Sequence, residues 1–300
     1  VRFLLPRSLN DLVRGLADVL SEELKELQYL GPLRSFPPRH LAFAEHEDSD
    51  WYAGGGYAWD VVRRDGAVRS AVNGWLGSAK LKTPYQLVVR RFVPFDSLKA
   101  PLSQALEDQH SGDLEIEDES PGGYWVRDAE EDASAILDAI EKDLREGIQE
   151  LSLVDKRTGT SVSHRDVGIG ISQVLPVLVA AYGSKGKLLA MEQPEIHLHP
   201  ALQAELADVF IESALGERKN VFILETHSEH LILRLLRRIR ESSESDQPGR
   251  HMLRPEDVQV LYFQPLPSGA RVVSLEIRPD GEFATPWPDG FFPERAEELF

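Results

Sequence analysis

Two residues that suit the binding of a metal-bound phosphate each follow an apolar run in the second half of the sequence. Glu192 ends the run LLAME, and His227 lies three positions after the run VFIL. If both runs are parallel strands, their carboxyl ends lie at the same edge of a sheet, where α/β proteins bind ligands. Carboxylate oxygens suit Mg²⁺, and an imidazole can contact a phosphate. The pair therefore predicts a site for Mg²⁺ and phosphate.

A glycine-rich stretch, DVGIGISQ at 166–173, fits the same site. Gly168 and Gly170 permit close approach of the backbone to a ligand, and the stretch opens a segment with helical character. The start of a helix offers free N–H groups and a partial positive charge to an anion. We expect the hydroxyl of Ser172 to touch this anion, and Gln173 is the neighbouring candidate for ligand binding.

Each of these features also has a purely structural interpretation. A glutamate at a strand end is often only solvated, a histidine such as His227 is often bonded within the fold, and a Gly-Ile-Gly loop is often a turn. His197 and His199 suggest a metal-binding pair at i, i+2, but no third ligand is evident. The order and spacing of the three features favour the phosphate site more than any one of them does.

The second half of the chain has regular patterns that would position these residues. We predict helices at 171–182, 200–215 and 229–240, and strands at 187–191, 221–224, 258–264 and 271–278. Pro200 suits the first position of a helix, and Thr226 with Glu229 matches a capping box. Short apolar strands alternating with helices indicate an α/β fold with a mostly parallel sheet, followed by a C-terminal β-hairpin.

The first half is less regular. We predict an amphipathic helix at 8–28 capped by Ser8, a proline-rich basic loop at 29–40, an exposed glycine-rich loop at 45–60, strands at 85–95 and 148–154, and a helix at 130–147. Residues 107–150 hold 16 acidic and 3 basic side chains, so −13 of the net charge of −17 lies there. This acidic segment is unsuited to nucleic acid. It is either solvated cover or a surface for a partner.

The composition excludes several classes of protein. The 300 residues contain no cysteine, which excludes disulfides and cysteine-based metal or catalytic sites. No apolar run is long enough to cross a bilayer, and no signal peptide is evident. We therefore expect a cytoplasmic protein without membrane contact. Because the first residue is Val1, we expect that the natural start lies upstream or has been trimmed.

Three motifs resemble those of a known family. DVGIGISQVLPVL, LLAMEQPEIHLHPALQAEL and VFILETHSEHLILRL resemble the signature motif, the Walker B motif with D-loop, and the switch-histidine region of ABC-type ATPases. The resemblance is closest to AAA ATPases of the OLD and SMC-like branch. YLGPLR near the start and PWPDGFFPERAEELF at the end resemble members of the DUF3696 type. This resemblance implies an ABC-type core in 1–100 and 151–300, with 101–150 as an acidic insertion.

The resemblance also implies a role for each candidate residue. Glu192 matches the Walker B carboxylate, which holds Mg²⁺ through water, and His227 matches the histidine that senses the γ-phosphate. His199 lies in the D-loop region, at a dimer interface. The signature loop, which reaches the nucleotide of the partner protomer, is matched by Gly168, Gly170, Ser172 and Gln173. The implied cofactors are ATP and Mg²⁺, and the implied assembly is a homodimer or higher oligomer that ATP closes and hydrolysis releases.

Two departures from the family pattern bear on catalysis. The position after the Walker B carboxylate usually holds a glutamate that polarises water, and here it is Gln193. An amide can orient a water but accepts no proton as a carboxylate does, so we expect slow hydrolysis, with Glu195 or Glu225 as substitute bases. The chain also has no P-loop, G-x-x-x-x-G-K-[ST]; GSKGKL at 183–188 is too short. We expect a carboxyl-terminal part of a longer ATPase, or a split ATPase whose partner supplies this loop.

Three functions are compatible with these residues. The first is an ATP-driven dimerising switch that controls an effector protein, such as a nuclease or toxin, as phage-defence ATPases of this branch do. The second is a non-catalytic scaffold with a degenerate ATPase fold, favoured by Gln193 and the missing P-loop and opposed by the pairing of Glu192 with His227. The third is an SMC-like DNA clamp, which the lack of sustained heptads disfavours.

Basic residues in the last predicted helix leave one further question open. Arg234, Arg237, Arg238 and Arg240 lie near its carboxyl end. This placement suits the helix dipole. The alternative is a contact with nucleic acid or with a partner.

Overall fold

The computed structural model describes most of the chain outside the acidic segment, namely residues 4–25, 27–34, 51–77, 80–92, 148–162, 168–244, 252–267 and 269–287. Residues 1–37, 46–86 and 153–300 form one compact unit, and residues 38–45 and 87–152 form another. All candidate site residues belong to the first unit. The helix predicted at 130–147 lies outside the described residues.

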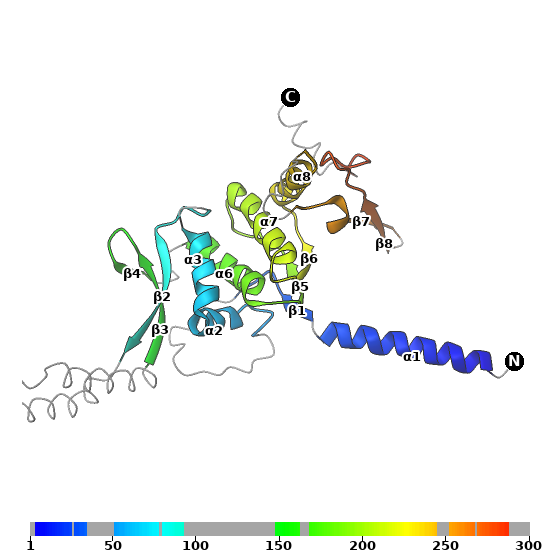
Figure 1. Ribbon diagram of the computed structural model, residues 1–300, viewed down its shortest axis with the longest axis horizontal. Coiled ribbons are helices and arrows are strands. Elements are labelled where there is room, and N and C mark those ends of the chain that lie inside the picture. Colours follow the sequence, from blue (N-terminus) through cyan, green and yellow to red (C-terminus); the bar gives the residue numbers. More distant parts are fainter. Residues whose placement is uncertain are drawn as a thin grey trace, which may run out of the picture. The chain divides into compact units, whose positions relative to one another are not determined.

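Helices and strands alternate along most of the chain (Figure 1). The described helices are α1 (Leu4–Lys25), α2 (Tyr57–Arg64), α3 (Gly66–Leu76), α6 (Gly168–Gly183), α7 (Pro200–Leu215), α8 (Glu229–Glu244) and the short 3-10 helix η1 (Pro255–Asp257). The described strands are β1 (Leu27–Leu30), β2 (Tyr85–Phe92), β3 (Ile148–Asp155), β4 (Thr160–Val162), β5 (Leu188–Glu192), β6 (Val221–Glu225), β7 (Val260–Leu266) and β8 (Gly269–Leu275). The predicted α/β class is confirmed.

A parallel sheet with the strand order β1-β5-β6 carries the candidate site. One face of this sheet is buried, as Leu189 and Met191 of β5 show. Helix α7 covers this face, because the rings of Phe210 and Phe222 lie 5.0 Å apart. Parallel sheets are usually buried on both faces. Here the opposite face carries half-exposed apolar residues, and in β6 both Val221 (60% exposed) and Ile223 (58%) are uncovered.

A buried asparagine joins the elements behind this sheet. The side-chain amide of Asn220 donates to the carbonyls of Ala181 (3.3 Å) and Ser184 (3.0 Å), at the end of α6, and to the hydroxyl of Ser213 (3.0 Å) in α7. Its carbonyl oxygen accepts from the backbone of Lys187 (3.0 Å), just before β5. These bonds satisfy buried polar groups and fix α6, α7 and the sheet to one another.

The glycine-rich stretch at 54–56 is not the exposed loop that we predicted. Gly55 and Gly56 are buried just before α2. Gly55 has φ +73°, and a Cβ there would lie 2.8 Å from the ring of Pro176 in α6. A Cβ on Gly56 would meet the ring of Trp51. The glycines therefore permit close packing, which composition alone does not reveal.

Two other predictions near the amino terminus need correction. The first helix begins at Leu4, so Ser8 lies inside it and does not cap it. The proline-rich loop predicted at 29–40 overlaps β1, because Tyr29 and Leu30 pair with β5 as strand residues. Pairing with a distant strand outweighs the local turn signals of the sequence.

The carboxyl-terminal hairpin β7–β8 confirms the two predicted antiparallel strands, with pairing from Val260–Leu275 to Leu266–Gly269. The neighbouring core joins α7, α8 and the segments on either side of the hairpin. Its buried members are Ile211, Ile232, Leu236, Ile239, Leu253 and Ile277.

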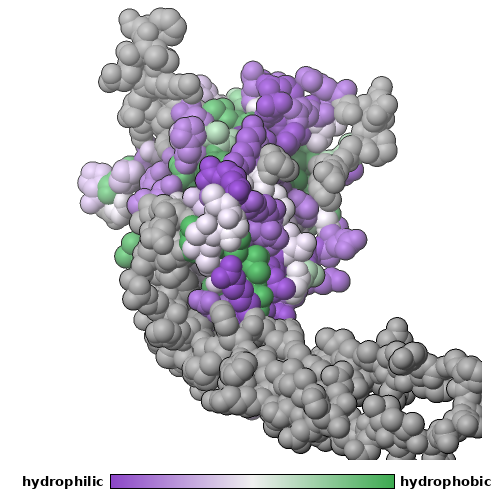
Figure 2. Space-filling view, turned by 90° about the vertical axis from the view of Figure 1, so that its left-hand side faces the viewer, coloured by the Kyte–Doolittle hydropathy of each residue, from purple (hydrophilic) through white to green (hydrophobic). Residues whose placement is uncertain are grey.

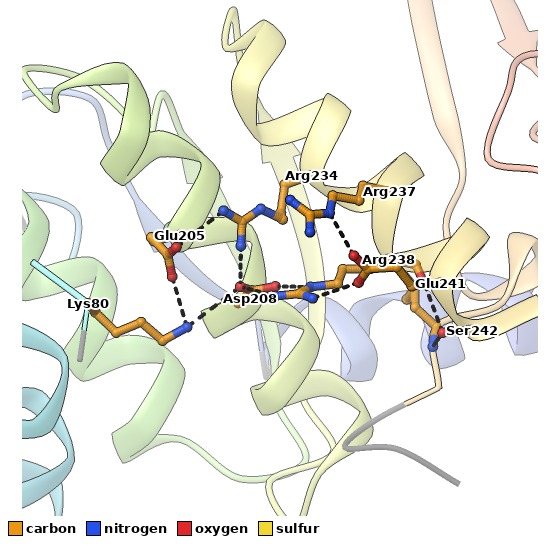
Figure 3. A network of polar contacts seen from close by, with 9 residues as sticks. Lys80, Glu205, Asp208, Arg234, Arg237, Arg238, Glu241 and Ser242 are labelled. Carbon is orange, nitrogen blue, oxygen red and sulfur yellow. Dashed lines mark hydrogen bonds and ion pairs between the residues drawn. The ribbon is translucent and has the colours of Figure 1, made fainter. Parts of the chain in front are cut away.

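The helices α7 and α8, which follow the two site strands, are joined by ion pairs (Figure 3). Asp208 of α7 accepts from Arg234 (2.7 Å) and from Arg238 (2.7 and 2.8 Å) of α8. Glu205 of α7 accepts from Arg234 (3.2 Å) and from Lys80 (2.9 Å). We call Lys80, Glu205, Asp208, Arg234 and Arg238 the interhelix network.

None of the helices in the described part of the chain combines the length and apolar character needed to cross a bilayer. The face seen from the left-hand side of Figure 1 is mostly hydrophilic, with apolar residues in small patches (Figure 2).

Candidate functional site

Two carboxylates lie side by side at the carboxyl end of the parallel sheet. Glu192 ends β5, Glu225 ends β6, and the two residues are partners in the strand register. The alternation of a strand places both on the face that carries Val221 and Ile223. The sheet therefore brings Glu192 to the position expected of a cation-binding carboxylate, and it adds Glu225 as a neighbour.

A tyrosine on the adjacent strand binds the first of these carboxylates. The hydroxyl of Tyr29, in β1, donates a hydrogen bond to Oε1 of Glu192. This hydrogen bond, with smaller effects of desolvation and of the charges of Glu192 and Glu225, raises the pKa of Tyr29 above its usual value. The tyrosine therefore stays protonated at neutral pH and remains a donor to Glu192.

The backbone turns sharply directly after Glu192. Gln193 has φ +43°, in the left-handed region that residues other than glycine seldom occupy. Its N–H donates to the carbonyl of Glu225 at 2.7 Å, and its carbonyl accepts from the N–H of Ile196 at 3.1 Å. Gln193 itself is half-buried. The amide that replaces the usual glutamate thus sits on a strained turn beside the two carboxylates.

Arg34 donates hydrogen bonds to the backbone of this turn. Its Nη2 donates to the carbonyls of Glu192 (2.9 Å) and Gln193 (3.1 Å), and its Nη1 donates to the carbonyl of Gln173 in α6 (3.0 Å). The arginine is only 4% exposed. Burial lowers the pKa of Arg34 to about 10, opposed by the charges of Glu195 and Tyr57, so the guanidinium remains charged at neutral pH. One buried cation therefore joins β5 to the glycine-rich helix start.

The side chain of Gln173 also forms hydrogen bonds with the backbone of Arg34. Its side-chain oxygen accepts from the backbone N–H of Arg34 (3.3 Å), and its side-chain nitrogen donates to the carbonyl of Arg34 (2.9 Å). Gln173 is 6% exposed, and its neighbour Ser172 is 1% exposed. We expected both residues to contact a nucleotide, and the structure places both side chains in the interior. Their contact with a ligand stays a prediction.

The glycine-rich helix start and the turn after β5 touch each other. A Cβ on Gly170 would lie 2.8 Å from the carbonyl oxygen of His197. A side chain at position 170 would therefore push the two segments apart. Gly170 is thus needed for packing inside this chain, whether or not a ligand also approaches it. Gly168 begins α6, three residues before the start predicted for this helix at residue 171.

His227 is held in place by a buried acid. Its backbone N–H donates to Oε1 of Glu195 at 2.9 Å. Glu195 is 6% exposed, and its Oε2 has no hydrogen-bond partner among the described residues. The side chain of His227 is exposed directly after β6. The structure therefore brings His227 to the same edge of the sheet as Glu192, with Glu195 setting its position.

Two helix caps differ from the predicted chemistry. The hydroxyl that caps α8 belongs to Ser228, which accepts from the N–H of Leu231 at 3.1 Å, whereas Thr226 accepts from Ser228 itself. His199 caps α7 by accepting from the N–H of Ala201 through Nδ1 at 3.3 Å. His199 therefore has a structural role as the N-cap of α7, and its place at a dimer interface stays a prediction.

The described residues do not by themselves form a complete metal site. Within the residues that the structure describes, no three histidine, aspartate or glutamate side chains gather as cation ligands. Magnesium sites in phosphate-binding proteins use one or two carboxylates, and phosphate and water oxygens complete the octahedron. Glu192 beside Glu225 fits such a site. His197 and His199 do not form one with a third ligand.

Several residues of the site gave no signal of their own in the sequence. Tyr29 and Arg34 belong to the motif YLGPLR, and Glu195 was predicted only as a substitute base. Their partners lie far away in sequence: Glu192 is 163 residues from Tyr29, and Gln173 is 139 residues from Arg34. The resemblance of YLGPLR to DUF3696 members was the available clue.

The fold and this strand-tip arrangement define an AAA-type ATPase domain. The chain belongs to the AAA domain family whose description names the AbiEii toxin and type IV toxin–antitoxin systems, and that family model matches residues 14–234. A second model, DUF3696, described as a protein of unknown function, matches residues 253–300. No curated protein matches the chain. The resemblance to AAA ATPases and to DUF3696 members is thereby confirmed, and the assignment to the OLD and SMC-like branch stays a prediction.

Proposed function

We propose that this chain binds Mg²⁺-ATP at the carboxyl end of the β1-β5-β6 sheet and hydrolyses it slowly. The observation that carries this proposal is the register of Glu192 with Glu225 at the strand tips, with His227 following β6 on the same edge. Glu192 would hold the cation through water, and His227 would contact the terminal phosphate. Bound Mg²⁺ would supply charge neutralisation for the phosphates.

Slow hydrolysis follows from the residue after Glu192. Gln193 can hold a water by hydrogen bonds but cannot take its proton as a carboxylate would. Glu225 pairs with Glu192 and lies close enough to the turn to accept from the N–H of Gln193 at 2.7 Å through its backbone. Its carboxylate is the better substitute base, because that of Glu195 is buried and holds His227.

The proposed ATP binding needs a phosphate-binding loop, and the 300 residues contain no P-loop motif. Among the described residues, no strand pairs with the outer edge of β6. A further parallel strand on this edge would end beside Glu225 and His227, where ligands bind in such sheets. A helix after that strand would cover Val221 and Ile223. We propose this edge as the place of the P-loop strand, in a longer chain or on a partner.

The ATP-bound form is proposed to dimerise and to control an effector protein such as a nuclease or toxin. The position of His199 at the exposed start of α7 supports an interface there. That residues 101–150 form an acidic insertion in the ATPase domain stays a proposal, and so does contact with nucleic acid. The α8 arginines Arg234 and Arg238 are engaged with α7, which favours a structural role for them over nucleic-acid binding.

A non-catalytic scaffold is the alternative, and the burial of Ser172 favours it, because a buried hydroxyl reaches no nucleotide. The two functions are separated by ATP turnover of the natural polypeptide, compared with Glu192→Gln and His227→Ala. The ATPase predicts measurable turnover that both substitutions abolish. No turnover and no ATP binding in the unaltered protein would leave the scaffold. Turnover that survives both substitutions would show that Glu192 and His227 do not carry the activity.

The intact mass of the natural polypeptide tells where to search for the P-loop. A mass well above 33.6 kDa, the mass of the 300 residues, points to a further segment of the same chain. An equal mass points to a partner chain, which co-purification with the natural polypeptide would identify.

A further inference from the structure

Glu192 is held at two points by one short segment, YLGPLR at 29–34. The hydroxyl of Tyr29 donates to its carboxylate, and Nη2 of Arg34 donates to its backbone carbonyl at 2.9 Å. The two contacts come from opposite ends of the same hexapeptide. Side chain and backbone of Glu192 are therefore both constrained before any ligand binds.

Tyr29 restricts the rotation of the Glu192 carboxylate, because its hydroxyl donates to Oε1. Residues that hydrogen-bond a metal-binding carboxylate fix its orientation, and their loss typically weakens metal binding or activity by 10- to 100-fold. Tyr29 is 42% exposed on the uncovered face of the sheet. Its ring therefore lies at the border of the site and needs no rearrangement to act on Glu192.

Arg34 stabilises the backbone from which this carboxylate projects. Gln193 keeps φ +43°, and such a conformation persists only where the surrounding structure enforces it. Arg34 donates to the backbone carbonyls of Glu192 and of Gln193 itself. It also donates to the carbonyl of Gln173, which links the turn to α6. A buried arginine with three carbonyl acceptors is a rigid support, because its planar fork has fixed donor directions.

We propose that Tyr29 and Arg34 are positioning residues that orient Glu192 toward a hydrated divalent cation. Tyr29 sets the rotation of the carboxylate, and Arg34 sets the turn after it. This inference rests on the proposed function, since it requires that Glu192 serve the cation. Neither residue bonds to the nucleotide in this account, so both act on the metal dependence of binding.

The test uses the natural polypeptide with Mn²⁺ as the probe. The free Mn²⁺ signal in electron paramagnetic resonance gives its dissociation constant in the presence of a non-hydrolysable ATP analogue. Tyr29→Phe removes only the hydroxyl and is expected to raise this constant about tenfold. Binding of the analogue without divalent cation should stay unchanged. Tyr262→Phe, which keeps the ring that packs on Trp287, is the matched control and should behave as wild type.

Arg34→Lys tests the second half of the inference. Lysine keeps the charge but cannot reach three carbonyls in one plane, so the turn should loosen and the Mn²⁺ constant should rise as for Tyr29→Phe. If this variant does not fold, Tyr29→Phe alone decides the proposal. A folded Arg34→Lys protein with wild-type Mn²⁺ binding would remove Arg34 from the account.

Glu192→Gln separates failure of this inference from failure of the proposed function. If Glu192→Gln binds Mn²⁺ and the analogue as wild type does, Glu192 serves no cation and the proposed function is wrong. If Glu192→Gln weakens Mn²⁺ binding and Tyr29→Phe does not, the positioning role is overturned and the ATPase function stands. Weakening by both substitutions supports the proposal.

Discussion

The backbone N–H of His227 is bonded at 2.9 Å to the buried carboxylate of Glu195, a residue that lies just after the strand of Glu192. This bond joins the turn after β5 to the turn after β6. The bond therefore helps to hold the backbones of the two turns together.

Glu195 should affect turnover through this acceptor and not as a base. Glu195→Gln keeps an oxygen that can accept from His227, so we expect ATP turnover to change little, although the substitution removes a charge that favours the buried Arg34 cation. Glu195→Ala leaves a partly buried N–H without this acceptor and should cost about 1 kcal/mol, measured by urea denaturation. Loss of turnover in a stable Glu195→Gln protein would show instead that Glu195 serves as the base.

Gln193→Glu should speed the chemical step. The new carboxylate would occupy the half-buried turn beside the proposed water and could accept its proton, and a positioned base typically contributes about 100-fold or more. Phosphate release in a single turnover measures this step directly, and Gln193→Ala is the control. A Gln193→Glu protein that binds ATP but hydrolyses it no faster would show that position 193 does not face the water.

Gly170→Ala should push the start of α6 away from the turn that follows β5. The added Cβ would lie 2.8 Å from the carbonyl oxygen of His197, so α6 or the turn after β5 must shift, and we expect a loss of stability of about 1–3 kcal/mol. Gly15→Ala is the matched control: nothing lies within 4 Å of its Cβ position in α1, and alanine there should stabilise the helix by up to about 1 kcal/mol. Equal effects of the two substitutions in thermal unfolding would contradict the packing role of Gly170.

The interhelix network should make stability fall in acid. Burial alone would raise the pKa of Asp208, but the hydrogen bond and charge of Arg238, with the charges of Arg234 and Lys80, outweigh it and hold this pKa below its usual value. A lowered folded-state pKa adds stability that is present above the unfolded-state pKa and is lost as pH falls through the folded-state pKa.

Asp208→Asn tests this pH dependence. We expect the substitution to cost about 3 kcal/mol at pH 7, because two arginines lose a partly buried partner. It should also flatten the decline in unfolding free energy below about pH 4. Glu217→Gln, at an exposed acid before β6, is the control. An acid decline of unchanged steepness in Asp208→Asn would place the responsible carboxylates elsewhere.

Elements with strong local signals were predictable from the sequence. Helix α7 begins at Pro200 and ends at Leu215 as predicted, because a proline fits the first position and an apolar stripe follows it. The strands β5 and β6 each lie within one or two residues of their predicted ends, since short apolar runs between turn residues are unambiguous here. The strand-tip placement of Glu192 followed from these elements.

Features that depend on distant partners were not predictable. Helices α2 and α3 were missed, because a glycine triplet and further glycines masked their apolar pattern, and the triplet packs against Trp51 and Pro176. The structural role of Arg34 depends on hydrogen bonds to carbonyls 139 to 159 residues away. The residues next to Arg34 in the sequence therefore do not indicate that it is buried. The N-cap of α8 was assigned to Thr226, although Ser228 also suits that position, and geometry selects Ser228.

The most direct test of the account is the Mg²⁺ dependence of ATP binding by the natural polypeptide, measured by isothermal titration calorimetry with and without the cation. The account predicts that Mg²⁺ tightens ATP binding and that Glu192→Gln removes this tightening while the fold is retained. ATP binding that is indifferent to Mg²⁺, an unchanged Mg²⁺ effect in Glu192→Gln, or no ATP binding at all would contradict it.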